Sequence, residues 1–255
     1  MHGWDGFFLW DHMRFSATFA VPVVDPWVLL AAVATRTSRV RLGTLITPVA
    51  RRRPWKLARE TVTLDHLSGG RVILGAGLGT PRDADFGSLG EDPDDRVRAE
   101  KLDEGLAVLT RLWSGEPFSF DGRYLRITDV AFAPTPVQMP RIPIWIGGAW
   151  PNRAPFRRAA RWDGVVPMAH DPNGAPREVT PGELAEIVGF VGAHRATDGA
   201  FDVAAAATGV DDQTIAAFEQ AGATWYLPEP GTQGPGWEDE VMAIVRAGPP
   251  RGSGA

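Results

Sequence analysis

The sequence predicts an α/β protein built as a TIM (β/α)8-type barrel, and three observations support this fold class. Patterns typical of strands and helices alternate along the whole 255-residue chain. The strand segments are short apolar runs, as expected for parallel strands that are buried on both faces. Several of these runs end in polar or glycine residues, at the strand ends where such barrels carry their chemistry. A doubly wound open sheet is the alternative, because it has the same alternation.

The segment 3–13 contains the leading functional candidate. Its apolar run from Phe7 to Trp10 is followed at once by Asp11 and His12. This pattern predicts a fully buried parallel strand that becomes polar where it leaves the sheet. An imidazole at that place can exchange a proton near neutral pH, so His12 is the catalytic candidate. The alternative is a histidine that only hydrogen-bonds a loop carbonyl. Asp11 either orients His12 or caps the loop.

Seven segments have the pattern of strands. They cover residues 7–10, 40–46, 71–77, 142–148, 162–168, 203–207 and 224–227. A closed barrel needs one more, and residues 1–3 look like the end of a helix that runs into a strand. The sequence therefore predicts that the first strand and helix are absent from this chain. The two strand edges left open favour a homodimer.

Seven segments have the pattern of helices. Pro26 and Pro54 occupy first-turn positions where proline is tolerated, and Asp25 can cap the first of these helices. The segment 94–113 repeats apolar residues along one helical face, ending at Trp113. The predicted helices cover residues 26–35, 54–67, 94–113, 152–161, 181–195, 214–221 and 237–246.

The remaining segments predict one domain with an insertion. Residues 80–92 form a long polar loop, and residues 114–140 form an insertion with a hairpin at 118–124, where Asp-Gly supplies the turn. We expect a single barrel domain over residues 1–247 and a flexible tail at 248–255, which is rich in Gly, Pro and Ser.

The composition excludes several classes of protein. The chain has no cysteine, which excludes disulfides, zinc–thiolate sites and thiol nucleophiles. Its net charge of −5 argues against nucleic acid as a partner. No apolar run approaches the ~20 residues that span a bilayer, and no signal-peptide pattern opens the chain. We therefore expect a cytoplasmic protein with no membrane partner and no metal site. A Schiff-base enzyme is disfavoured because Lys56 and Lys101 lie on predicted helices.

Four stretches together resemble one known family, the bacterial luciferase-like flavin-dependent oxidoreductases. The resemblance runs from residue 3 to about 168 and continues more weakly to residue 227. The stretches are GWDGFFLWDH at 3–12, the LGT, TP and RRP elements of 42–54, TLDHLSGGRV with GAGLG within 63–79, and PIWIGG at 143–148. Members of the family usually begin one strand and one helix earlier than this chain does.

The resemblance implies a TIM barrel that binds FMN or the deazaflavin coenzyme F420 at its C-terminal face. It implies hydride transfer to, or monooxygenation of, a small organic substrate, with His12 near the reactive edge of the flavin as acid or base. The insertion at 114–140 resembles the family insertion that covers the pocket. The alternative is a cofactor-less or truncated relative that acts only as a binding or assembly protein.

The cofactor candidates lie at predicted strand ends. Aromatic side chains there are candidates to line the pocket, a threonine to hydrogen-bond the isoalloxazine ring, and glycines to bring backbone N–H groups near the cofactor or its phosphate. Tight turns explain the glycines equally well, and packing in the core explains the aromatic residues equally well. The candidates are Trp10, Thr47, Gly77, Gly79, Trp145, Gly147 and Gly148.

Three further expectations concern the neighbouring positions. The resemblance implies a non-proline cis peptide near Leu45–Ile46. It also suggests that the run 51–53 pairs with a phosphate or polyglutamate tail, although a solvated basic helix start explains this run as well. The deazaflavin-linked sugar-phosphate dehydrogenases carry a carboxylate where this chain has Thr80 and Pro81, so that activity is not expected. The second Asp-His pair, Asp65–His66, ends a helix on the opposite face and is expected to be structural.

Overall fold

The computed structural model describes residues 3–20, 22–207, 211–228 and 236–249. Its contacts group into two compact units, Gly6–Ile144 and Trp145–Ala255, the second joined by Met1–Asp5. The division into two units leaves the single domain over 1–247 a prediction. Most of the predicted flexible tail, residues 250–255, lies outside the described residues.

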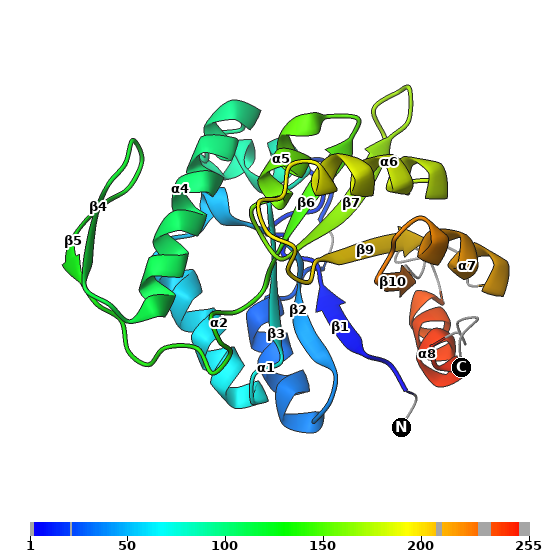
Figure 1. Cartoon of the computed structure of the whole chain (residues 1–255), viewed down its shortest axis with the longest axis horizontal. Helices are drawn as coiled ribbons and strands as arrows, with labels where there is room; N and C mark the ends of the chain where they lie inside the picture. The colour runs from blue at the N-terminus through cyan, green and yellow to red at the C-terminus, as the bar shows by residue number, and fades with distance from the viewer. Residues whose placement is uncertain (1–2, 21, 208–210, 229–235, 250–255) are drawn as a thin grey trace. The chain divides into compact units, whose positions relative to one another are not determined.

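The first unit is built on three parallel strands with helices between them (Figure 1). The strand order is β1, β2, β3, and Leu42 of β2 pairs with Phe7 of β1 and Val72 of β3. Each strand ends within two residues of the sequence-based boundary. The elements are β1 (Gly6–Leu9), α1 (Pro26–Arg36), β2 (Arg41–Pro48), the 3-10 turn η1 (Val49–Arg51), α2 (Pro54–Ser68) and β3 (Val72–Gly77).

The expected full burial is right for β3 and wrong for β1. Every residue of β3 is buried, whereas Phe7 of β1 is 39% exposed. The reason is position, because β1 stands at the end of the strand order and β2 is its one strand neighbour among the described residues. The apolar sequence of β1 resembles that of a fully buried strand, but as an edge strand of the described sheet β1 has no neighbouring strand on one side.

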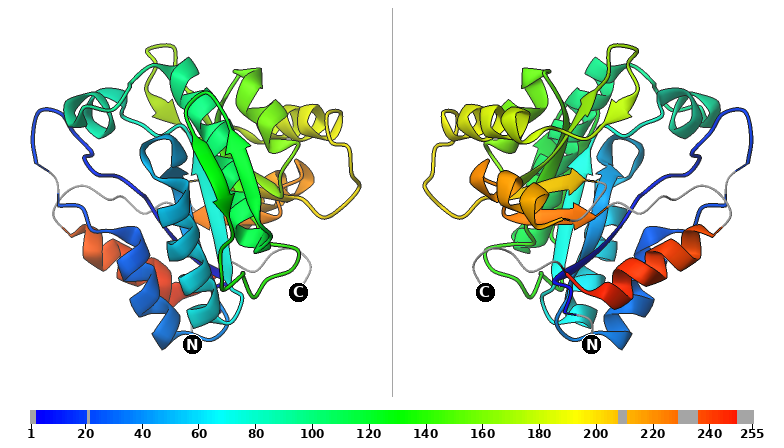
Figure 2. Two further views of the ribbon diagram at one scale, coloured as in Figure 1. Left: turned by 90° about the vertical axis from the view of Figure 1, so that its left-hand side faces the viewer. Right: turned by 90° about the vertical axis from the view of Figure 1, so that its right-hand side faces the viewer.

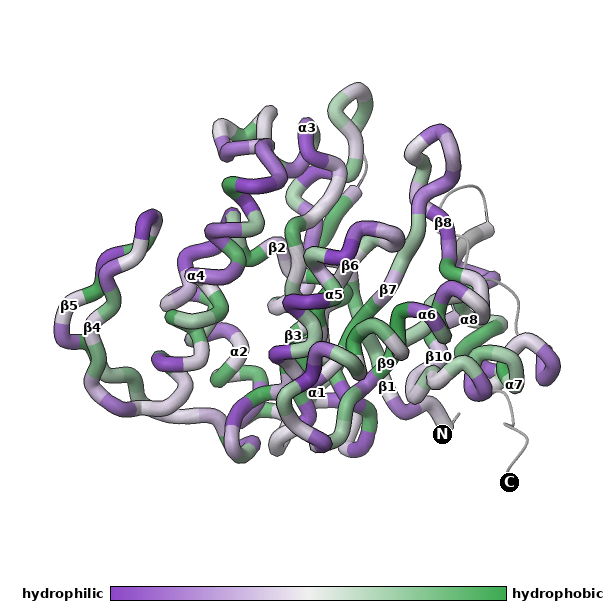
Figure 3. Tube along the Cα trace, turned by 45° about the horizontal axis from the view of Figure 1, so that its top comes forward, coloured by the Kyte–Doolittle hydropathy of each residue, from purple (hydrophilic) through white to green (hydrophobic). Residues whose placement is uncertain are grey.

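Helix α4 (Asp95–Ser114) is the longest helix described, and its apolar face is confirmed. Leu102, Leu106 and Trp113 are all buried, while polar residues alternate with them along the helix (Figure 3). Asp94 caps the first turn by accepting from the backbone N–H groups of the two residues Arg96 and Val97.

The insertion contains the predicted antiparallel hairpin, β4 (Phe118–Asp121) and β5 (Arg126–Val130), which stands beside α4 (Figure 2). Residues 122–125 connect the two strands, and Glu104 of α4 accepts hydrogen bonds from three successive backbone N–H groups of this turn, those of residues 123, 124 and 125. Asp65 accepts from the backbone N–H groups of residues 137 and 138, and His66 Nε2 lies 2.7 Å from the carbonyl of Thr135. The structural role expected for Asp65–His66 is therefore confirmed.

The second unit also has parallel strands, in the order β6, β7, β9, β10. Thr180 opens α6 with a capping box that includes Glu183. A short antiparallel strand, β8 (Pro176–Arg177), pairs with β7 inside a segment expected to be a loop. The remaining elements are β6 (Ile144–Trp150), α5 (Arg153–Ala159), β7 (Gly164–His170), α6 (Pro181–Gly192), β9 (Asp202–Ala207), α7 (Asp212–Gln220), β10 (Trp225–Pro228) and α8 (Trp237–Ala247).

Candidate active site

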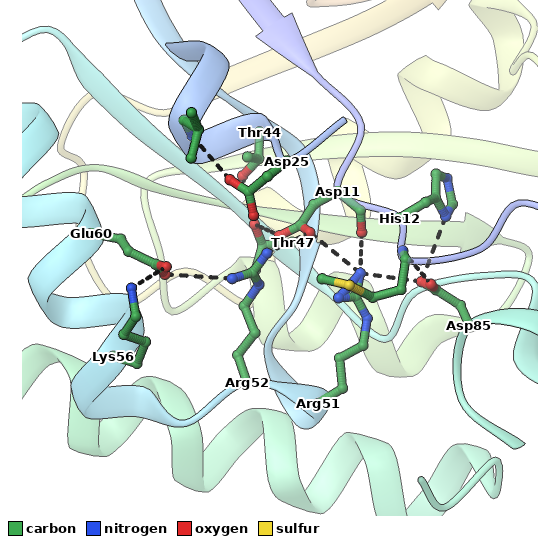
Figure 4. Close-up of polar contacts among 12 residues, drawn as sticks. Asp11, His12, Asp25, Thr44, Thr47, Arg51, Arg52, Lys56, Glu60 and Asp85 are labelled. Carbon is green, nitrogen blue, oxygen red and sulfur yellow. Dashed lines mark hydrogen bonds and ion pairs between the residues drawn. The ribbon is translucent and has the colours of Figure 1, made fainter. Parts of the chain in front are cut away.

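Three segments of the first unit meet where its strands end (Figure 4). The residues after β1 supply Asp11 and His12, and the end of β2 with η1 supplies Thr47 and Arg51. The loop after β3 supplies Asp85, at the end of the short helix α3 (Arg82–Asp85). Parallel strands place their carboxyl ends at one edge, which is why residues so far apart in the sequence converge here.

His12 faces Asp85. The imidazole Nδ1 lies 3.6 Å from Asp85 Oδ2, and the carboxylate is fully buried while the His12 side chain is 16% exposed. The ring stands edge-on to Trp10 at 6.0 Å and to Phe15 at 5.3 Å between ring centres. Two aromatic rings and one carboxylate thus fix the orientation of the imidazole.

Asp85 is an ionised, anchored carboxylate. Its Oδ1 accepts from the backbone N–H groups of Met13 at 2.7 Å and Arg14 at 3.1 Å. Burial raises the pKa of Asp85, but His12, the Arg51 guanidinium and those two N–H groups lower it by more, so its pKa lies below the ordinary value of 3.8. The group is therefore negatively charged at neutral pH.

Asp11 turns away from His12 toward a buried ionic network. Its Oδ2 accepts from the Thr47 hydroxyl at 2.8 Å, and its Oδ1 pairs with Arg52 at 2.7 Å and with Arg51 at 3.3 Å. Arg51 also donates to the main-chain carbonyl of Asp11. The structure thus places Asp85, and not Asp11, against the imidazole of His12.

Arg51 links the two carboxylates. One of its terminal nitrogens lies 3.3 Å from both Asp11 Oδ1 and Asp85 Oδ2, and its side chain is only 3% exposed. Burial lowers the pKa of Arg51, and the two carboxylates oppose that effect. Arg52 pairs with Glu60 as well as with Asp11. A solvated basic helix start therefore does not describe Arg51 and Arg52.

Arg53 differs from its two neighbours. It is exposed and lies over the Trp55 ring at 5.7 Å. The basic run opens onto a cavity of about 320 Å³ that also has acidic and apolar walls. The cavity is lined by Met13, Arg51, Arg52, Arg53, Lys56, Leu57, Glu60, Leu89 and Glu91.

The end of β2 has the expected backbone geometry. The Leu45–Ile46 peptide is cis, as the family resemblance implies. Thr44 and Thr47 are buried and their hydroxyls lie 2.8 Å apart. Because Thr47 donates to Asp11, the hydroxyl proposed for the flavin ring already belongs to the ionic network.

Gly77 is the last residue of β3, where it pairs with Pro48 of β2, and Gly79 lies in the turn that follows. Gly79 has a φ of +82°, and a Cβ there would lie 2.6 Å from Pro48. The buried Arg98 of α4 donates to the carbonyls of Leu78 and Gly79 at 3.0 and 2.9 Å. Position 79 thus needs glycine for backbone and packing reasons, which is the structural alternative considered for it.

The other three cofactor candidates lie in the second unit. Trp145 is buried, donates to Asp202 Oδ2 at 3.1 Å and packs against Trp225. Gly147 and Gly148 lie within β6, which runs two residues beyond Gly148, and not in a turn after the strand. A Cβ on Gly148 would lie 2.6 Å from Pro155, so this glycine allows α5 to approach the strand closely.

Sequence reasoning missed Asp85. It lies in the segment 80–92, which contains several acidic residues and no periodic pattern. A carboxylate that reaches back from the end of β3 to the end of β1 is a long-range feature, and no local signal distinguishes Asp85 from its exposed neighbour Asp83.

Two features are not found among the described residues. Within them, no group of three or more His, Cys, Asp or Glu side chains is placed to hold a metal ion. No helix in the described part of the chain is both long and apolar enough to cross a bilayer.

The parallel strands with intervening helices form an α/β fold of the TIM-barrel type, and a histidine–carboxylate pair lies at the strand ends of the first unit. The chain belongs to the luciferase-like monooxygenase family, whose sequence profile matches residues 1–240.

Curated relatives and solved structures agree with this assignment. An F420-dependent glucose-6-phosphate dehydrogenase of Microbacterium testaceum is 34% identical over 152 residues, covering 58% of this chain and 44% of the relative. An F420-dependent hydroxymycolic acid dehydrogenase of Mycobacterium tuberculosis is 32% identical over 209 residues, covering 74% and 55%. The structure of the monooxygenase RslO1 from Streptomyces bottropensis matches with a TM-score of 0.61 at 25% identity, covering 86% and 64%. The chain thus spans about half the length of these two curated relatives.

Proposed function

We propose that this chain is an oxidoreductase that uses coenzyme F420 or FMN to transfer a hydride to or from a small organic molecule, with His12 as the acid or base. The observation that carries the proposal is the His12–Asp85 pair at the strand ends, with the imidazole edge-on to the stacked rings of Trp10 and Phe15. The family membership and the F420-dependent relatives support the choice of cofactor. Monooxygenation is the second reaction considered, because RslO1 is a monooxygenase.

The residues of the first unit fit a flat, polar-edged cofactor in their chemistry. Trp10 is 43% exposed and stacks on Phe15 with ring planes 9° apart, which offers an aromatic surface. Nε2 of His12 makes no hydrogen bond with a described residue, and the His12 side chain is 16% exposed, so this nitrogen is available to a substrate or cofactor atom. When bound, F420 or FMN would supply the redox chemistry. His12 would hold or accept the proton that accompanies hydride transfer.

We propose the remaining candidates as binding residues. Thr47, Gly77 and Gly79 would contribute in the first unit, and Trp145, Gly147 and Gly148 are proposed for the second unit taken by itself. Asp11 would act by holding the Thr47 hydroxyl and Arg51 in place. Glucose 6-phosphate is not proposed as the substrate, because Thr80 and Pro81 stand where the resemblance places a carboxylate.

The first test separates binding from turnover. We expect the protein to quench F420 fluorescence or shift the FMN spectrum on binding. We expect His12→Gln to keep that binding while turnover falls by about 10²- to 10⁴-fold, the usual contribution of a general acid or base. His194→Gln is the matched control, since His194 is exposed and belongs to the second unit. If the native chain binds neither cofactor, the proposal is wrong. If turnover is unchanged in His12→Gln, His12 is not the acid or base.

A second candidate is a binding or assembly protein, and exposed apolar side chains favour it. Phe19, Val24 and Val28 are each more than half exposed in the segment from β1 to α1. We propose that such surface supports a homodimer, in the cytoplasmic location expected from the sequence. Light scattering at micromolar concentration tests the dimer, and a monomeric mass contradicts it.

A further inference from the structure

Two buried polar atoms face each other in the candidate site. His12 Nδ1 and Asp85 Oδ2 lie 3.6 Å apart, and neither makes a hydrogen bond within the described part of the chain, although Asp85 Oδ2 also forms an ion pair with Arg51 at 3.3 Å. Leaving a buried polar group without a partner costs about 1–3 kcal/mol. Each atom is therefore the natural partner of the other, and an approach of less than about 1 Å would form the bond.

Asp85 is hydrogen-bonded to the segment that contains His12. Its other oxygen accepts from the N–H groups of Met13 and Arg14, the two residues that follow His12. Movements of the β1 exit and of α3 are thus coupled, so the imidazole and the carboxylate stay together. Asp11 cannot take this place, because Thr47, Arg51 and Arg52 occupy its oxygens.

The chemistry of the pair decides which nitrogen of His12 carries the proton. A carboxylate only accepts hydrogen bonds, so a neutral imidazole beside it must present N–H at Nδ1. The lone pair then lies on Nε2, which makes no hydrogen bond with a described residue and does not face Asp85.

We infer that Asp85 is the positioning residue of His12: it holds the imidazole in the Nδ1–H tautomer and leaves Nε2 as the atom that exchanges the proton. The role of Asp85 in turnover rests on the proposed function. The tautomer itself is a property of the protein without cofactor and can be measured independently.

The experiment is ¹⁵N NMR of the protein labelled at histidine, above the pH at which imidazoles are protonated. Signals of His12 are assigned by their loss in His12→Gln. We expect native His12 to show a protonated Nδ1 and an unprotonated Nε2, and Asp85→Asn to shift the signals toward the other tautomer. Asp83→Asn is the matched control, because Asp83 is an exposed acid on the same short helix.

Kinetics supply the second arm. In Asp85→Asn we expect kcat to fall about 10- to 100-fold, part of the full acid–base contribution, with KM and cofactor affinity changed less than about twofold. Native His12 with its proton on Nε2 overturns the inference even if Asp85→Asn does not fold. Asp85→Asn that folds and keeps the Nδ1–H tautomer also overturns it. Failure of the native protein to bind F420 or FMN would instead contradict the proposed function and leave the tautomer result standing.

Discussion

At the scale of single residues, the site is organised by buried charge. Asp11, Arg51 and Asp85 form a row in which one guanidinium lies between two carboxylates, all nearly excluded from water. Each buried charge in this row is compensated by its neighbours, so removing one residue leaves another charge buried without a partner. His12 could be predicted from its position directly after a strand. Its partner Asp85 could not, because charge pairing between distant segments leaves no pattern in the local sequence.

Removing the central cation should therefore destabilise the protein. In Arg51→Met we expect the free energy of unfolding to fall by about 3–5 kcal/mol, because two carboxylates stay buried without their shared cation. Urea unfolding followed by circular dichroism measures the change. Arg53→Met is the control and should change it by less than about 0.5 kcal/mol, as Arg53 is exposed. A loss below about 1 kcal/mol in Arg51→Met would show that the row is not a structural unit.

At the scale of elements, the start of α6 is stabilised by an ionised side chain. Glu183 accepts from the backbone N–H of Thr180 at 2.8 Å and pairs with Arg177 at 2.6 Å. Mainly through the bond from Arg177, the pKa of Glu183 falls from 4.5 to about 2. A folded-state pKa below the unfolded value means that the stabilisation is complete above about pH 4.5 and disappears as the pH falls toward 2.

We expect Glu183→Gln to lose about 1 kcal/mol of unfolding free energy at pH 7, a value reduced for the partial exposure of this pair. The difference from the native protein should shrink between pH 4.5 and 2, where the native carboxylate takes up a proton. Urea unfolding across this range measures it, with Glu186→Gln on the exposed side of the same helix as control. A difference that stays constant with pH would contradict the assignment.

Elements with a strong local pattern were predictable, and elements defined by distant partners were not. Helices α1 and α2 begin at the predicted prolines, because a capping residue or first-turn proline acts within one turn. The exposure of β1, the short strand β8 and helix α3 depend on which strand or loop lies alongside. In the site, positions at strand ends were found, while the contacts of Asp11, Thr47 and Asp85 required the fold.

At the scale of the whole molecule, cofactor binding should appear as stability. A ligand that binds only the folded state at 100 times its dissociation constant adds about 2.7 kcal/mol to the free energy of unfolding. We expect F420 or FMN, whichever binds, to raise the melting temperature by several degrees in a concentration-dependent way. Adenosine monophosphate, which carries a phosphate but no flavin ring, should leave it unchanged. An equal rise with adenosine monophosphate would show that the flavin ring is not specifically recognised.

The hydrogen bonds from the hairpin turn to Glu104 make this turn suitable for attaching a fluorescent dye. Glu104 holds three main-chain N–H groups, so it recognises the path of the chain and not the side chains at residues 123–125. Since the natural chain has no cysteine, one thiol introduced at Leu125 would be the only attachment point for a dye. Gly122 is unsuitable, because a Cβ there would lie 2.5 Å from the Glu104 carboxylate. A fluorophore on this turn could then report how the insertion responds when substrate is added.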